Sequence, residues 1–421
     1  MNFIEELKWR GVLHDMMPGT DKQLEEKMTT GYIGFDPTAD SLHVGSLAQI
    51  ITLMRFQQAG HKPIALIGGS TGMVGDPSGK SAERNLLDLD TLNKNVKGIQ
   101  LQLEKFLDFN CGDNSAELVN NFDWMKNFSF LDFIRDIGKS ITVNYMMAKD
   151  SVSKRLEGEN GMSFTEFTYQ LLQGYDFLHL FKEKNCVLQM GGSDQWGNIT
   201  TGSDLISKRG GKAFALTTQL IKKSDGTKFG KTESGNIWLD RTKTSPFKFF
   251  QFWMNVSDED AESFIKIFTF LSKSEIDSLI ENHKASKGER ILQKVLAREL
   301  TIMVHSEEDF NKAVETSSFI FKCKSDDIAR LEPEEFNDIM SELVTFEIEN
   351  IEDMNIVDFL VDKVKAFPSK TKLRELMKTN AIALNKIKVS DVTKLVTKDD
   401  FIHNGLVVSK GKKENFLIKI K

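Results

Sequence analysis

Residues 31–46 constrain the fold of this chain more than any other stretch. Residues 32–35 are predicted to form a short strand, which ends at Pro37 because proline fixes φ and has no backbone donor. A helix follows, with apolar residues at i, i+3, i+4 and i+7, and the apolar run 63–67 is typical of a second strand. Strand, helix and strand within about forty residues form a βαβ unit, which begins many nucleotide-binding parallel sheets.

His43 and Gly45 lie where the predicted helix begins. Backbone N–H groups at a helix start and the positive end of the helix dipole attract phosphate. We expect these N–H groups to be free, the glycine to let a nucleotide approach the backbone, and the histidine to donate a hydrogen bond to a phosphate oxygen. A helix cap with an incidental histidine would give the same pattern, so the rest of the chain has to decide.

The composition is that of an ordinary globular protein, and 421 residues suffice for about two or three domains. The three cysteines are scattered, so neither a disulfide framework nor a zinc site is predicted. No apolar run approaches the length of a membrane span, and residues 1–6 lack a signal-peptide pattern. We therefore expect a cytoplasmic protein without a membrane partner.

Charge is distributed unevenly along the chain. The formal net charge is −6, yet residues 363–421 contain 15 Lys and Arg against 5 Asp and Glu. This segment carries +10, which leaves −16 on the remainder. A basic segment with recurring apolar residues favours a folded module that binds a polyanion, whereas a solvated lysine-rich tail is the alternative.

A glycine-rich turn at residues 68–81 follows the second predicted strand. Its end is similar to a P-loop, but the position that needs glycine is occupied by Val74. Open α/β sheets bind ligands at the carboxyl ends of their strands. Asp76 is therefore expected to face a cation such as a substrate ammonium, with a plain turn aspartate as the alternative.

Three polar residues share one face of a predicted helix that opens with a capping box at residues 163–166. Tyr169, Gln173 and Asp176 are spaced at i, i+4 and i+7, which places them on one side. Their apolar neighbours indicate a buried helix, and buried polar groups need partners. A small polar ligand would supply these partners, although a solvated face could show the same spacing.

Two later segments offer groups for ribose and phosphate. Asp194 follows another predicted strand at a second strand–glycine–helix junction, where it can bind ribose hydroxyls. Residues 222–232 form a basic, glycine-bearing loop. Lys228 and Lys231 can reach phosphates from this loop, and Thr232 can donate a further hydrogen bond; a plain surface loop is the alternative.

Together these stretches resemble the bacterial-type tyrosyl-tRNA synthetases, a family of class I aminoacyl-tRNA synthetases, over nearly the whole chain. His-Val-Gly-Ser resembles the class motif His-x-Gly-His, and Lys-Phe-Gly-Lys-Thr resembles Lys-Met-Ser-Lys-Ser. Two departures are Ser46 in place of the second motif histidine, and Asn385-Lys386 where the family often has Asn-Gly. The motifs follow family order and spacing at residues 31–47, 68–84, 169–177, 189–198 and 224–232.

The resemblance implies an α/β fold in four segments. They are a Rossmann-like parallel-sheet catalytic domain at 1–221, a catalytic loop plus α-helical anticodon-binding domain at 222–325, an acidic linker at 326–352 and an S4-like α/β RNA-binding domain at 353–421.

The resemblance also implies roles for individual residues. The expected tyrosine-binding residues are Tyr32, Asp76, Tyr169, Gln173, Asp176 and Gln195. The expected ATP-binding residues are Asp36, Thr38, His43, Gly45, Gly192, Asp194, Lys228 and Lys231. The expected catalytic residues are His43, Lys228, Lys231 and Thr232.

The implied reaction activates L-tyrosine with ATP and then transfers the tyrosyl group to tRNA(Tyr). No resident metal site is expected, and Mg²⁺ would arrive with ATP. A homodimer is implied, with residues 121–160 as a candidate contact. A tryptophanyl-type synthetase and a non-catalytic RNA-binding protein on a synthetase scaffold are the alternatives.

Overall fold

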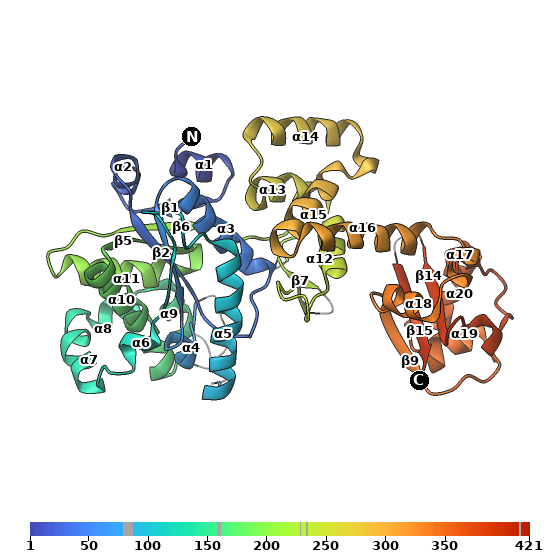
Figure 1. The fold of residues 1–421 in the computed structure, drawn as a ribbon. Coiled ribbons are helices and arrows are strands. Elements are labelled where there is room, and N and C mark those ends of the chain that lie inside the picture. The colour runs from blue at the N-terminus through green and yellow to red at the C-terminus, as the bar shows by residue number, and fades with distance from the viewer. Residues whose placement is uncertain (79–86, 158–160, 228, 233–234, 412–413) are drawn as a thin grey trace. The chain divides into compact units, whose positions relative to one another are not determined.

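The computed structural model describes residues 1–78, 87–157, 161–227, 229–232, 235–411 and 414–421. The chain divides into two compact units (Figure 1). The first unit contains Met1–Thr244 and Val256–Leu296, and the second contains Ser245–Asn255 and Ala297–Lys421. Within the described ranges, no helix combines the length and the apolar character needed to cross a bilayer.

The first unit is built on a six-stranded sheet in the order β1-β6-β5-β2-β3-β4. Only β1 is antiparallel to its neighbour, so the predicted parallel Rossmann-like sheet is confirmed. Strand β3 is buried from Pro63 to its end, because helices cover both faces of the parallel sheet. The strands are β1 (Leu13–Met16), β2 (Thr30–Phe35), β3 (Lys62–Ile67), β4 (Glu117–Asn120), β5 (Cys186–Gly192) and β6 (Phe214–Thr218).

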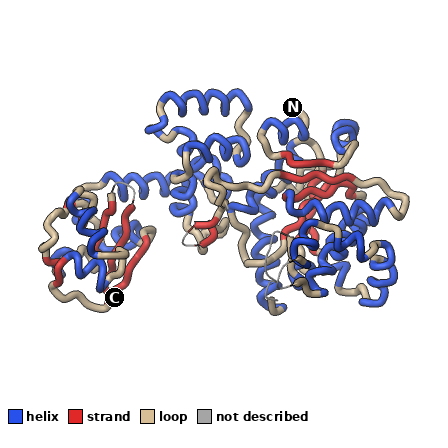
Figure 2. Tube along the Cα trace, turned by 180° about the vertical axis from the view of Figure 1, so that it is seen from behind, coloured by secondary structure: helices blue, strands red, loops and turns tan. Residues whose placement is uncertain are grey.

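Helices flank this sheet, with α3 and α5 on one side and α10 and α11 on the other (Figures 1 and 2). The predicted βαβ unit is β2, α3 and β3. The helices that precede residue 208 are α1 (Phe3–Trp9), α2 (Thr20–Glu26), α3 (Val44–Gln58), α4 (Thr71–Val74), α5 (Leu89–Phe106), α6 (Phe122–Met125), α7 (Phe130–Asp136), α8 (Val143–Met147), α9 (Asp150–Leu156), α10 (Phe164–Lys184) and α11 (Trp196–Ser207).

Two buried arginines hold the end of a later helix of the same unit, α13 (Asp258–Phe268). Arg55, in the last turn of α3, donates to the carbonyl oxygens of Ile267 and Thr269 at 2.9 and 2.8 Å. Arg10 donates to Thr269 O at 3.0 Å. Burial, with Arg10 nearby, lowers the pKa of Arg55 to about 9.

The first unit also holds β7 (Lys231–Thr232), β8 (Gly235–Asn236) and α14 (Lys273–Ala285). Helix α15 (Ile291–Val304) spans the division between the units.

The second unit contains helices and a five-stranded sheet in the order β12-β11-β14-β15-β9. Strand β9 runs parallel to β15, while β11, β12, β14 and β15 pair antiparallel. Its elements are α12 (Pro246–Met254), α16 (Glu307–Lys322), α17 (Ser325–Ala329), α18 (Pro333–Met340), β9 (Val344–Ile348), β10 (Met354–Asn355), α19 (Ile356–Asp358), α20 (Lys370–Lys378), β11 (Ile382–Leu384), β12 (Ile387–Lys388), β13 (Leu395–Val396), β14 (Gly405–Lys410) and β15 (Glu414–Ile420).

The acidic segment expected as a linker at 326–352 instead contains helices and an edge strand of this sheet. Phe336 and Met340 are each 1 % exposed and lie on one face of α18. Ile348 is also buried, at the end of β9. The acidic composition of the segment did not predict these elements, because its acidic residues lie on the solvent side while a few apolar residues pack in the core. Residues 222–244 and 256–296 likewise group with the first unit rather than with a separate helical domain.

The unusual Asn385-Lys386 turn has a structural explanation. Both residues lie in the left-handed region, with φ of 44° and 70°. A two-residue type I′ hairpin turn requires positive φ at both of its central residues. Lys386 Nζ donates to Ile320 O at the end of α16 at 2.6 Å and to Asn415 Oδ1 at 2.8 Å. The lysine thus ties the hairpin to α16, which a glycine at this position would not do.

Candidate active site

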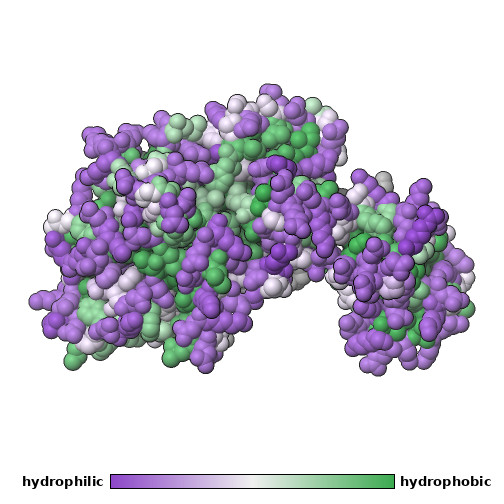
Figure 3. Space-filling model, in the orientation of Figure 1, coloured by the Kyte–Doolittle hydropathy of each residue, from purple (hydrophilic) through white to green (hydrophobic). Residues whose placement is uncertain are grey.

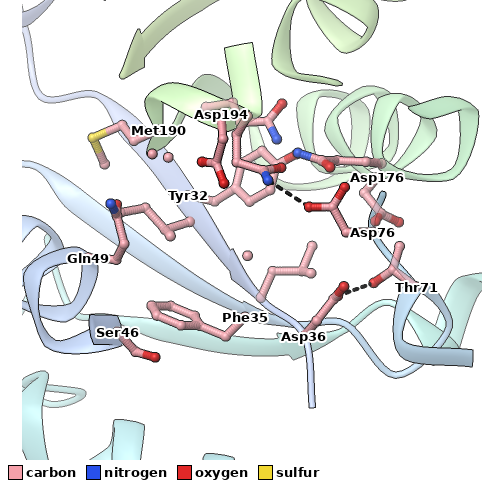
Figure 4. A pocket seen from close by; sticks show the side chains of 18 of the residues that line it. Tyr32, Phe35, Asp36, Ser46, Gln49, Thr71, Asp76, Asp176, Met190 and Asp194 are labelled. Atoms are coloured by element: carbon pink, nitrogen blue, oxygen red, sulfur yellow. Dashed lines mark hydrogen bonds between the residues drawn. The ribbon is translucent and has the colours of Figure 1, made fainter. Parts of the chain in front are cut away.

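A cavity of about 340 Å³ lies at the carboxyl ends of β2 and β5 in the first unit (Figure 4). Thr38 does not line it, because this residue lies exposed in the turn after Asp36. Lys228 falls outside the described residues, as do the side chains of Lys231 and Thr232. The predicted site residues that the cavity brings together are Tyr32, Asp36, His43, Gly45, Asp76, Tyr169, Gln173, Asp176, Gly192, Asp194 and Gln195.

Asp176 and Tyr32 both line the cavity and are buried, with 2 % and 1 % of their surface exposed. Asn121 Nδ2 donates to one carboxyl oxygen of Asp176 at 2.9 Å, and Trp124 Nε1 donates to the other at 2.8 Å. Burial raises the pKa of Asp176 to about 7, against the lowering effect of these two donors, and Asp36 raises it further. Near neutral pH the carboxyl group therefore exchanges readily between its acidic and ionised forms.

Several buried acceptors of the cavity have no hydrogen-bond partner among the described residues. They are Tyr32 Oη, Gln49 Oε1, Gln173 Oε1 and Gln189 Oε1. Burial, together with Asp176, holds the pKa of Tyr32 well above its ordinary value, so its hydroxyl stays protonated. Because buried polar atoms are normally paired, this set fits a ligand that brings its own hydroxyl and N–H donors.

Asp36 organises the next part of the wall. Tyr169 Oη donates to Asp36 Oδ2 at 2.7 Å. Thr71 Oγ1 donates to Asp36 Oδ1 at 2.7 Å, as the dashed line in Figure 4 marks. Burial and this carboxylate raise the pKa of Tyr169 well above its ordinary value. The Tyr169 hydroxyl is thus a fixed donor to Asp36, and its lone pairs remain able to accept a hydrogen bond from a ligand.

Asp76 has features of both a turn aspartate and a carboxylate that faces a cation site. Its Oδ1 accepts from the backbone N of Ser78 at 2.9 Å, which is the contact of a turn aspartate. Its Oδ2 accepts from Gln195 Nε2 at 2.7 Å, and Asn198 Nδ2 lies 3.4 Å from Oδ1. The carboxylate nevertheless lines the cavity, where it can meet a cation.

The helix start at His43 differs from the expectation in one respect, since the first N–H groups of α3 are not free. Val44 N donates to Ile237 O at 3.0 Å, Gly45 N to His43 Nδ1 at 3.0 Å, and Ser46 N to His43 O at 2.8 Å. The sequence could not reveal this, because one partner lies almost 200 residues downstream. These three backbone N–H groups are therefore not available to a phosphate, which leaves only the side chain of His43 from the predicted pair of features.

The contact with Gly45 fixes the chemistry of His43. Because Nδ1 accepts a hydrogen bond, the proton of the neutral ring resides on Nε2, which is then a donor. A Cβ added at Gly45 would lie 2.7 Å from Cε1 of this ring. Glycine is required here to make room for the histidine, and close approach of a nucleotide is not needed to explain it.

Sequence reasoning missed several residues of the wall. Asn121 and Trp124 lie in the segment 121–160, for which the sequence predicts only a subunit contact, and the polar atoms of these two side chains are the one signal that could have identified them. Thr71 and Asn198 contact Asp36 and Asp76 from the two glycine-rich junctions. Among the described residues, no group of three His, Cys, Asp or Glu is arranged to hold a metal ion.

Comparison with known proteins gives concordant results along the chain. The family "tRNA synthetases class I (W and Y)" matches residues 24–322, and the "Tyrosine--tRNA ligase SYY-like C-terminal domain" matches residues 335–418. Tyrosine--tRNA ligases from Bacteroides fragilis (strain YCH46) and Flavobacterium psychrophilum are each 57% identical over 430 residues, covering 100% of both chains. A C-terminally truncated mitochondrial tyrosyl-tRNA synthetase from Aspergillus nidulans superposes with a TM-score of 0.67 at 31% identity, covering 76% of this chain and 94% of that one.

The parallel sheet, the His43 helix start and the cavity at the strand ends are those of a class I aminoacyl-tRNA synthetase. Within this class, the chain belongs to the tyrosyl-tRNA synthetase family. The predicted family and enzyme class are therefore confirmed, and the tryptophanyl-type alternative is not favoured.

Proposed function

We propose that this chain activates L-tyrosine with ATP, giving tyrosyl-adenylate and pyrophosphate, and then transfers the tyrosyl group to the 3′ end of tRNA(Tyr). The observation that carries the proposal is that Tyr32 and Asp176 are both buried in the cavity wall, where Tyr32 Oη and three glutamine oxygens have no hydrogen-bond partner among the described residues. It is supported by the 57% identity to tyrosine--tRNA ligases over the full chain.

Tyrosine would bind with its phenol toward Tyr32 and Asp176. The carboxylate of Asp176 already accepts two hydrogen bonds, and its remaining lone pairs can accept a third from the substrate hydroxyl. The substrate ammonium would meet Gln173 Oε1, the Tyr169 hydroxyl and Asp76, all on the cavity wall. These three acceptors match the three donors of an ammonium group.

Activation needs no general base, because the substrate carboxylate is already a nucleophile toward the α-phosphate. Catalysis then consists of positioning the reactants and stabilising negative charge as it moves onto pyrophosphate. His43 Nε2–H is a neutral donor for this charge. Lys228, Lys231 and Thr232 are proposed to contribute further donors, while Gly192 and Asp194 would contact the ribose.

ATP enters as a substrate, and we propose that Mg²⁺ arrives with its phosphates rather than in a resident site. The charge of Mg²⁺ would offset that of the phosphates.

For tRNA, we propose that the basic module after residue 353, together with strand β9 of its sheet, binds the polyanion. A cytoplasmic location stays a prediction.

A homodimer is proposed through the segment from α6 to α9. Exposed large apolar side chains gather on this segment, and green atoms mark that end of the first unit in Figure 3. Exposed apolar clusters of this kind are typical of protein–protein contacts. Sedimentation of the full chain tests the assembly. The exposed residues are Phe122, Phe130, Leu131, Ile134, Val143, Met147 and Leu156.

The test of the proposed activity is amino-acid-dependent ATP–pyrophosphate exchange, with tyrosine, phenylalanine and tryptophan run in parallel. Exchange with tyrosine alone is expected. Exchange with tryptophan would reject the assignment of Tyr32 and Asp176, and the absence of exchange from folded protein would favour the non-catalytic RNA-binding alternative.

A further inference from the structure

A short antiparallel backbone pairing joins the start of α3 to the segment that follows the basic loop. His43 and Trp238 form an antiparallel bridge. On either side of it, Val44 N donates to Ile237 O at 3.0 Å, and Leu239 N donates to Leu42 O at 2.9 Å. Residues 237–239 therefore run directly alongside the histidine motif, within the first unit.

Gly230, in the basic loop at residues 222–232, lies against the start of α3. Ile237 N donates to Gly230 O at 3.2 Å, which connects this segment back to the loop. Gly230 has φ of +82°, and a Cβ added there would lie 2.9 Å from Val44 Cγ2 and 3.3 Å from Gly45 N. The two motifs that distinguish the class are thus in direct contact, and residue 238 lies at their junction.

The side chain of Trp238 is half-buried at this junction and contacts His43. The two ring centroids are 6.1 Å apart with an interplanar angle of 67°, which is an edge-to-face arrangement. Lys243 Nζ lies 5.5 Å from the centroid of the Trp238 ring, and it forms an ion pair with Asp40 at 2.6 Å. Trp238 N also donates to Thr244 Oγ1 at 3.0 Å, so both its backbone and its ring are held.

These contacts constrain His43 in complementary ways. The hydrogen bond from Gly45 N fixes which nitrogen carries the proton, whereas the edge-to-face contact with the Trp238 ring restricts the tilt of the imidazole. We infer that Trp238 is a positioning residue for His43 in the activation step, and that it holds Nε2–H toward the phosphates of ATP. The inference rests on the proposed function of His43.

The first test compares two replacements of Trp238 in ATP–pyrophosphate exchange. Trp238→Leu keeps a smaller apolar side chain but removes the aromatic ring, and it is expected to lower kcat/KM for ATP about 3- to 10-fold, as loss of one aromatic pair contact implies. Trp238→Phe keeps an aromatic ring at this position and is expected to stay within about twofold of the parent. The KM for tyrosine should not change in either variant.

Controls separate positioning from general loss of structure. Trp9→Leu removes another half-buried tryptophan, remote from the cavity, and should leave exchange unchanged. Thermal unfolding identifies any variant that does not fold, in which case Trp238→Met replaces the leucine variant. An equal loss in the phenylalanine and leucine variants, or no loss in either, would overturn the inference.

A double-mutant cycle with His43→Ala gives the decisive result. If Trp238 acts through His43, Trp238→Leu should change exchange by less than about twofold once the histidine is absent. A full, multiplicative loss in the His43→Ala background would mean that Trp238 contacts ATP or supports the fold independently, and would overturn the inference. Undiminished exchange in His43→Ala alone would instead reject the proposed role of His43, which is a distinguishable outcome.

Discussion

If Asp176 binds the substrate phenol as proposed, its buried carboxyl group should make the affinity for tyrosine depend on pH. Burial raises the pKa of this group to about 7, and the substrate hydroxyl binds best to its ionised form. About a tenth of the group is ionised one pH unit below its pKa and about nine-tenths one unit above it. The Kd for tyrosine should therefore fall about tenfold between about pH 6 and pH 8 if only the ionised form binds.

The assay is equilibrium dialysis of labelled tyrosine against the full chain across this pH range. Free tyrosine keeps its charge there, so the dependence reports on the protein. Asp176→Asn should bind weakly and with a flat pH profile. Asp123→Asn alters an exposed carboxyl group in the same region, beside Trp124, and should keep the slope of the parent. A flat profile in the parent, or an unchanged slope in Asp176→Asn, would refute the reasoning.

Three further changes test other parts of the structure. Gly45→Ala forces a Cβ against the His43 ring and should lower exchange about 10- to 100-fold with an unchanged Kd for tyrosine; an active variant would show that the ring position is not critical. Arg155→Met leaves Glu166 buried without its 2.6 Å ion pair and should lower the free energy of unfolding by about 3–5 kcal/mol in urea, whereas Met at both positions should recover most of it. Truncation after residue 323 should spare exchange but reduce tRNA charging, and normal charging would exclude the C-terminal module as an RNA contact.

Local patterns were sufficient to predict the strands β2, β3 and β5 of the central sheet and much of the cavity lining, but not β1 or β4. Strands buried on both faces are largely apolar. Helix spacing placed Tyr169, Gln173 and Asp176 on one side, where all three line the cavity. These features depend on residues close in sequence. The truncation is placed after residue 323, rather than at the predicted domain boundary of 353, because β9 (Val344–Ile348) belongs to the C-terminal sheet. The acidic composition around β9 did not indicate this.

The features that the sequence did not reveal depend on contacts between distant segments. The partner of Val44 N is Ile237, and the donors to Asp176 are Asn121 and Trp124, on a different element. Such pairings leave no periodic signal, because each requires the fold to bring one residue to another. The same holds for Lys386, whose role becomes visible only beside α16.

The central claim is that Tyr32 and Asp176 select the phenol of the substrate, and the ratio of kcat/KM for tyrosine over phenylalanine in pyrophosphate exchange tests it most directly. The ratio should be high in the parent, because phenylalanine leaves buried polar groups unpaired. Tyr32→Phe removes one hydrogen bond and should lower the ratio about 2- to 12-fold. A parent that exchanges equally well with phenylalanine, or a ratio that does not change in Tyr32→Phe, would contradict the account.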